Sequence, residues 1–159
     1  MKRSRCLGSL AAMLAFTACD PLFSTEYRQP IAPITADQCV ETALRSSPLV
    51  AIVSRDKDPD SRDVTSSYHI VVRDSATAGG EWDGQAAREQ KGDSAWVRLS
   101  YQYMGFATPP RSDRARWESE AYEILESVRA RCAPEAPSAV TCRAGGGLGG
   151  QRGACSTRS

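Results

Sequence analysis

VTSSYHIVVR, residues Val64–Arg73, alternates between apolar and polar side chains. Tyr68, Ile70 and Val72 fall on one side of an extended chain, and polar residues dominate the other side. A period of two residues is typical of a strand with one buried face. Residues 95–104, AWVRLSYQYM, alternate in the same way. The two segments predict antiparallel strands whose sheet has one face in the core and one in solvent.

A third strand is predicted on the amino-terminal side of this pair. Residues 49–54, LVAIVS, form a short apolar run rich in β-branched side chains, which is typical of a central strand. The acidic segment 56–63, DKDPDSRD, predicts a solvated turn between this strand and the next. Residues 74–94 are mainly polar and contain Gly79, Gly80 and Gly84, so we expect a long loop there.

Two helices are predicted to flank the strands. Thr35 begins a capping box, and Pro48 ends the first helix because proline disfavours helical backbone in the residue before it. Ser112 is placed to cap a second helix over 113–131, where apolar residues recur at three- and four-residue spacing. The predicted fold class is therefore α+β, in the order α-β-β-β-α over residues 35–132. It has a three-stranded antiparallel sheet with two helices on one face.

The segments on either side of this domain lack a sustained pattern. Residues 19–34 carry Pro21, Pro30 and Pro33, which predicts a semi-extended tether spanning at most roughly 50 Å. Residues 133–159 are rich in glycine and proline and have little apolar content, which predicts a disordered tail.

The first nineteen residues, MKRSRCLGSLAAMLAFTAC, have the pattern of an export signal. A basic segment precedes a short apolar run that is too short to span a bilayer. The run Phe16-Thr17-Ala18-Cys19 resembles the bacterial lipobox. That resemblance implies a lipoprotein signal peptide over residues 1–18, cut by signal peptidase II before a Cys19 that carries diacylglycerol. An ordinary secretory leader, with Cys19 unmodified, is the alternative.

Lipidation would place the protein in the bacterial envelope, anchored in a membrane and facing the periplasm. The resemblance leaves open whether that is the inner or the outer membrane. Removing Lys2, Arg3 and Arg5 with the leader reduces 20 basic side chains to 17 against 19 acidic ones, a formal charge of −2. Proteins that bind nucleic acid usually carry the opposite sign, so we expect no nucleic-acid partner.

Four cysteines remain after Cys6 leaves with the leader and Cys19 takes a lipid: Cys39, Cys132, Cys142 and Cys155. An even number in an oxidising compartment predicts disulfides, with three possible pairings. We expect Cys39–Cys132, which flanks the two helices and would stabilise the domain by roughly 4 kcal/mol, and Cys142–Cys155. One difficulty is that three strands between the helices would make the helices parallel, leaving Cys39 and Cys132 at opposite ends.

Few residues suggest chemistry. The sequence has no Cys-x-x-Cys or Cys/His cluster, so we expect no metal site and no cofactor. His69 is the single histidine, and an envelope hydrolase that uses His69 with carboxylates is the enzymatic alternative. Trp82 lies in a polar segment, where it is either tucked onto the core or presented to a partner. The favoured expectation is a non-enzymatic binding or scaffolding module for an unknown envelope protein or polymer.

Overall fold

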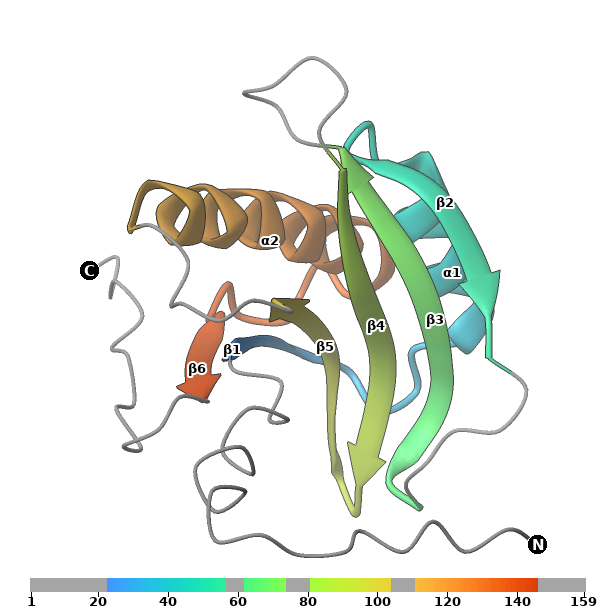
Figure 1. The fold of residues 1–159 in the computed structure, drawn as a ribbon. Helices are drawn as coiled ribbons and strands as arrows, with labels where there is room; N and C mark the ends of the chain where they lie inside the picture. Colours follow the sequence, from blue (N-terminus) through green and yellow to red (C-terminus); the bar gives the residue numbers. More distant parts are fainter. Residues whose placement is uncertain (1–22, 57–61, 74–80, 104–110, 146–159) are drawn as a thin grey trace, which may run out of the picture.

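The described part of the chain forms one sheet with two helices, in the order β-α-β-β-β-β-α-β (Figure 1). The computed structural model describes residues 23–56, 62–73, 81–103 and 111–145. The elements are β1 (Phe23–Ile31), α1 (Asp37–Ser46), β2 (Val50–Arg55), β3 (Val64–Arg73), β4 (Glu81–Lys91), β5 (Ser94–Tyr103), α2 (Arg111–Cys132) and β6 (Thr141–Gly145).

Within the described residues the sheet has six strands in the order β2-β3-β4-β5-β1-β6, and every neighbouring pair is antiparallel. The prediction of a three-stranded sheet in an α-β-β-β-α order is therefore wrong. The three predicted strands correspond to β2, β3 and β5, while β1, β4 and β6 come from segments expected to be irregular. β2 is an edge strand rather than a central one, and its apolar residues Val50 and Val53 are buried.

Both helices cover the same face of the sheet (Figure 1). The core lies between the sheet and the two helices. It is built from alternate strand residues and from one side of each helix, and its largest fully buried members include Leu44, Tyr68, Ile70, Leu99, Ile124 and Leu125.

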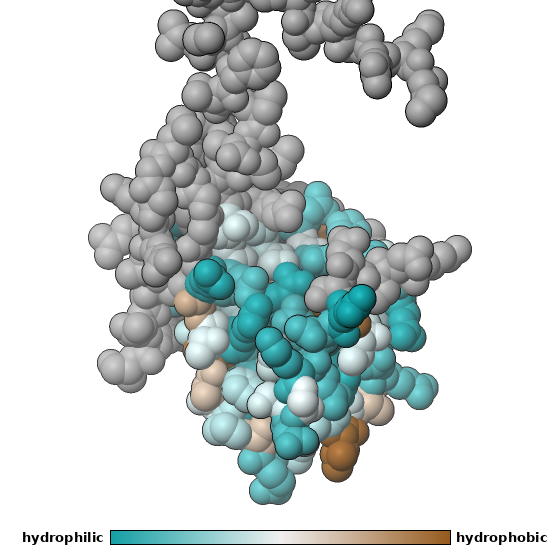
Figure 2. Space-filling view, turned by 90° about the horizontal axis from the view of Figure 1, so that it is seen from below, coloured by the Kyte–Doolittle hydropathy of each residue, from teal (hydrophilic) through white to brown (hydrophobic). Residues whose placement is uncertain are grey.

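In the part of the chain that the structure describes, no helix is both long and apolar enough to cross a membrane. Figure 2 shows the underside of the molecule, where hydrophilic residues dominate and apolar residues occur singly.

The segment expected to be a tether contains a full strand of the sheet. β1 pairs with β5 from Phe23↔Tyr103 to Ile31↔Ala95, and its alternate residues Tyr27 and Ile31 are buried. Pro30 obscured this pattern because proline cannot donate to a strand ladder. On the other side of β1, β6 pairs only with Ser24–Arg28, so Pro30 lies beyond the end of that ladder. The proline is thus tolerated where one side of β1 has no paired strand.

β4 occupies much of the segment expected to be a loop. Its residue Gly84 fits closely against the neighbouring strands, because a Cβ there would lie 3.3 Å from both the Ile70 Cγ1 atom and the Ser100 carbonyl oxygen. Gly92 adopts a left-handed φ of 58° in the short turn that joins β4 to β5, a conformation that favours glycine. Gly84 therefore serves close packing, and Gly92 serves the hairpin turn.

The segment predicted as a disordered tail is partly folded. β6 pairs with β1, and the connection from α2 is held by side chains from two elements. Gln29 Nε2 donates to the Pro137 carbonyl at 2.8 Å, and the Tyr122 hydroxyl donates to the Val140 carbonyl at 3.4 Å. The prediction is therefore wrong for residues 133–145, while residues 146–159 lie outside the described residues.

The helices have the relative direction that a cross-link between them requires. Four antiparallel strands, rather than three, connect α1 to α2, so the two helices run in opposite directions. Cys39 in the first turn of α1 therefore meets Cys132 at the end of α2, with 5.8 Å between their Cα atoms. The predicted disulfide Cys39–Cys132 is confirmed, and the unpredicted strand β4 explains why the helices are not parallel.

Candidate ligand site on the open face of the sheet

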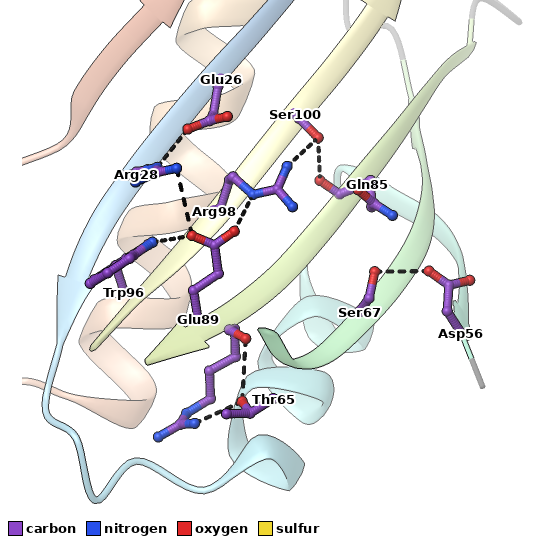
Figure 3. A network of polar contacts seen from close by, with 11 residues as sticks. Glu26, Arg28, Asp56, Thr65, Ser67, Gln85, Glu89, Trp96, Arg98 and Ser100 are labelled. Carbon is purple, nitrogen blue, oxygen red and sulfur yellow. Dashed lines mark hydrogen bonds and ion pairs between the residues drawn. The ribbon is translucent and has the colours of Figure 1, made fainter. Parts of the chain in front are cut away.

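The face of the sheet turned away from the helices carries a connected polar cluster. Strand residues that alternate with the buried ones build it, so β1, β4 and β5 each contribute side chains to the same surface (Figure 3). We call these residues the open-face cluster: Glu26, Arg28, Glu89, Trp96, Arg98 and Ser100.

Glu89 on β4 links the side chains of the cluster that come from β1 and β5. Its side chain is only 10% exposed, and it accepts a hydrogen bond from Arg98 Nε at 2.6 Å and another from Trp96 Nε1. The Nη2 atom of Arg28 lies 3.7 Å from the Oε2 atom of Glu89 and forms an additional ion pair. A nearly buried carboxylate costs free energy unless it is paired and hydrogen-bonded, and these contacts provide both.

Arg28 is the exposed member of the cluster, with 41% of its side chain accessible. Its guanidinium carbon lies 5.4 Å from the centre of the Trp96 ring, within range of a cation–π interaction. Arg28 Nε also donates to Glu26 at 2.5 Å. The positive charges of Arg28 and Arg98 are thus balanced by two carboxylates, so the cluster does not select a ligand by net charge.

A depression of about 440 Å³ lies beside Trp96, where β1 ends and β5 begins. This volume is within the range of roughly 300–1,000 Å³ that is typical of small-molecule sites. Its lining combines aromatic, guanidinium, carboxylate and hydroxyl groups with apolar surface: Arg28, Pro30, Ile31, Asp93, Ser94, Ala95, Trp96 and Thr141. Asp93, Ser94 and Thr141 are exposed, so their polar groups remain accessible to a ligand.

A second polar cluster lies at the start of α1 and is structural. Arg88 is 5% exposed and donates to Thr65 Oγ1 at 2.7 Å and to the Pro33 carbonyl at 2.6 Å. Its Nε atom lies 3.6 Å from a carboxylate oxygen of Asp37 in the first turn of α1. These contacts tie the start of α1 to β3 and β4, and they use the guanidinium for packing rather than for a ligand.

His69 lies on the open face of β3, away from the depression. It is 51% exposed, and its Nε2 atom lies 3.4 Å from a carboxylate oxygen of Asp83, which is itself 83% exposed. Across the ladder His69 faces Gln85, so Glu89 is four residues further along β4, roughly 13 Å away. The structure therefore does not bring His69 close to Glu89 in the open-face cluster.

Among the described residues, no group of three or more metal-ligating side chains occurs.

The remaining predicted site residues are only partly described. Cys142 is disulfide-bonded, but its predicted partner Cys155 and the predicted lipidation site Cys19 lie outside the described residues, so both assignments stay predictions. Trp82 lies in β4 opposite Val72, and its side chain is outside the described part of the structure. Whether the Trp82 ring contacts a partner therefore remains a prediction.

Sequence reasoning missed the open-face cluster as a site. The alternation of residues 95–104 places Trp96, Arg98 and Ser100 on the polar side of a strand, which was the only available signal. Arg28 and Glu89 came from segments expected to be a tether and a loop, so nothing placed them beside Trp96. Neither a protein-family model nor a curated protein matches the chain, and the site must be interpreted from its own residues.

Proposed function

We propose that the chain is a lipid-anchored protein of the bacterial envelope, facing the periplasm, whose folded domain binds another envelope component without catalysing a reaction. The observation that carries this proposal is the depression beside Trp96 and Arg28, where exposed polar groups meet an aromatic ring. The lipobox-like sequence ending at Cys19 supports the location.

The chemistry of the depression favours a hydroxyl-rich polymer such as a cell-wall glycan. The arginines of the cluster already have carboxylate partners, so neither a strongly acidic nor a strongly basic ligand is favoured. Asp93, Ser94 and Thr141 offer a carboxylate and two hydroxyls, which can exchange hydrogen bonds with sugar hydroxyls. Trp96 adds apolar ring surface, and aromatic area combined with a few polar groups is typical of ligand sites.

A sedimentation assay with isolated peptidoglycan tests the binding proposal. The wild-type domain should sediment with the polymer, while Asp93→Ala and Trp96→Ala should each weaken binding about tenfold, which corresponds to about 1.4 kcal/mol. Asp83→Ala and His69→Ala are the matched controls, because they remove exposed polar groups of the same sheet face outside the depression. Equal losses in the controls, or no sedimentation of the wild type, would contradict the proposed site.

Metabolic labelling tests the anchor. The wild-type chain should incorporate labelled palmitate and enter the detergent phase, whereas Cys19→Ser should accumulate as an uncut, unlabelled precursor. Cys6→Ser is the control, since it removes the other leader cysteine and should leave the labelling unchanged. Palmitate labelling that survives Cys19→Ser would show that this residue is not the acceptor.

A further inference from the structure

The folded sheet begins very close to the proposed lipid anchor. β1 starts at Phe23, only four residues after Cys19. We infer that the anchor holds one end of the domain directly on the bilayer surface and turns the ligand depression away from it. This inference rests on the proposed lipidation of Cys19.

The length of the connection decides how freely the domain can move. Four Cα–Cα steps of about 3.8 Å span at most about 15 Å, compared with the roughly 50 Å that a fifteen-residue tether would allow. A domain of about 120 residues has a radius of gyration of roughly 14 Å, and so a diameter well above the reach of this connection. The domain therefore cannot rotate freely above the membrane, and the end nearest residue 23 stays at the headgroups.

The elements at that end follow from the strand register. We call this end of the sheet the anchor end. It comprises the start of β1 at Phe23 and Ser24, together with their paired residues Tyr103 at the end of β5 and Gly145 at the end of β6. α2 begins at the same end and runs in the direction of β1. Trp117 packs beside the level of Thr25, the partner of Tyr101, and Tyr122 packs two residues further along β1, at Tyr27. Trp117 stacks on Tyr101, and Tyr122 contacts Tyr27, with ring centres 6.4 and 6.1 Å apart. Figure 1 shows β1 and α2 starting on the same side.

The anchor end presents a basic side chain to the lipid headgroups. The first six residues of α2, RSDRAR, carry three arginines and one aspartate, and β6 adds the exposed Arg143. Asp113 pairs with Arg116 at 3.4 Å, and Glu118 and Glu120 follow on the next turn, so the arginines of α2 lie among as many carboxylates. The exposed Arg143 is therefore the basic side chain on which attraction to the headgroups rests. Basic residues within about a Debye length of anionic headgroups are attracted to them.

The depression lies at the opposite end of the same strand. It is lined by Ile31 at the end of β1 and by Ser94 at the start of β5. Eight residue steps at about 3.3 Å separate Phe23 from Ile31, so the depression is roughly 26 Å from the anchor end along β1. Contact between the anchor end and the bilayer thus leaves the ligand site open to the aqueous compartment.

Paramagnetic broadening of amide NMR signals tests this orientation. Full-length acylated protein is placed in bicelles of phosphatidylcholine and phosphatidylglycerol that contain a nitroxide-headgroup lipid, with nitroxide-free bicelles as reference. We expect the amides of Ser24, Ala115 and Arg143 to broaden strongly, and those of Ile34 and Gly92 to stay sharp. Equal broadening at both ends, or stronger broadening at Gly92, would overturn the inference.

Two controls separate the causes. Insertion of twelve Gly/Ser residues between Leu22 and Phe23 keeps the anchor but restores a long tether, and it should abolish the gradient. Arg143→Gln should weaken the gradient in bicelles with phosphatidylglycerol and leave it unchanged in bicelles of phosphatidylcholine alone. The mass of the amino-terminal peptide is measured first. A peptide without acyl groups contradicts the proposed anchor itself, whereas an acylated protein without a gradient contradicts only the orientation.

Discussion

Glu89 is the residue on which the open-face cluster depends. Replacing it with Gln keeps the shape of the side chain but removes the charge that faces Arg98 and Arg28. Removing one partner of a nearly buried pair leaves the other charge uncompensated, so Glu89→Gln should lower the free energy of unfolding by about 1–3 kcal/mol. Urea denaturation followed by circular dichroism measures this change.

Asp83→Asn is the matched control for that measurement. Asp83 is an exposed carboxylate on the same strand, and its replacement should change the free energy of unfolding by less than about 0.5 kcal/mol. Equal effects of the two substitutions would mean that Glu89 is not stabilised by its partners in the way the contacts indicate.

β6 and the segment before it form the element whose stability contribution differs most from the sequence expectation. A disordered tail could be deleted without effect, but residues 133–145 supply a strand and the carbonyl that Gln29 binds. Deleting residues 133–159 should therefore lower the free energy of unfolding by roughly 2–4 kcal/mol relative to deleting residues 146–159. The variant that lacks residues 146–159 also carries Cys142→Ser, so that neither protein retains Cys142 and its disulfide. Equal stabilities would show that β6 adds nothing.

The disulfide between α1 and α2 makes a separate contribution at this scale. It closes a loop with a sequence separation of 93 residues, which includes most of the sheet. The free energy of unfolding of the double variant Cys39→Ser/Cys132→Ser should be about 2–5 kcal/mol lower than that of the wild type. Thermal melts of both proteins, with and without reductant, measure the difference. If reductant lowers the melting temperature of the double variant as much as that of the wild type, another bond is responsible.

The elements that the sequence predicted are those whose burial follows their hydrophobicity. β3 and β5 alternate clearly, and α2 repeats its apolar residues at helical spacing, so each was predicted within about two residues of its observed bounds. β4 was not predictable in this way, because the buried residues of its described part include Arg88 and Glu89, and the buried apolar residues there are alanines. Partners from other elements make this burial possible. The same lack of local signal hid the open-face cluster, which exists only when β1, β4 and β5 are adjacent.

Buried tyrosines set the alkaline limit of the whole molecule. Burial raises the pKa of the Tyr27 phenol well above its ordinary value of 10.0, and Glu118 raises it further. Burial also raises the pKa of Tyr101, with Glu120 adding to the effect. Both phenols stay protonated in the folded state, whereas in the unfolded chain they ionise near pH 10. Their contribution to stability is therefore complete below pH 10 and is lost as the pH rises above it.

Urea denaturation at several pH values checks this expectation. Above pH 10 the free energy of unfolding should fall by about 1.4 kcal/mol per pH unit for each of the two tyrosines. Tyr27→Phe and Tyr101→Phe should each reduce that slope by about 1.4 kcal/mol per pH unit, while leaving any change between pH 7 and 9 unaltered. A wild-type protein whose stability stays constant to pH 11.5 would contradict the assignment.

The position of β1 between β5 and β6 has a mechanical consequence. β1 pairs with β5 along its whole length and with β6 over its first half. Tension applied at the amino end of β1, and resisted at the other end of the sheet, runs along the strand axis. The ladder bonds on both sides of β1 are then loaded together in shear rather than broken one after another. A strand loaded in shear resists pulling better than one peeled from its end, so the two ladders of β1 would resist tension applied at its amino end.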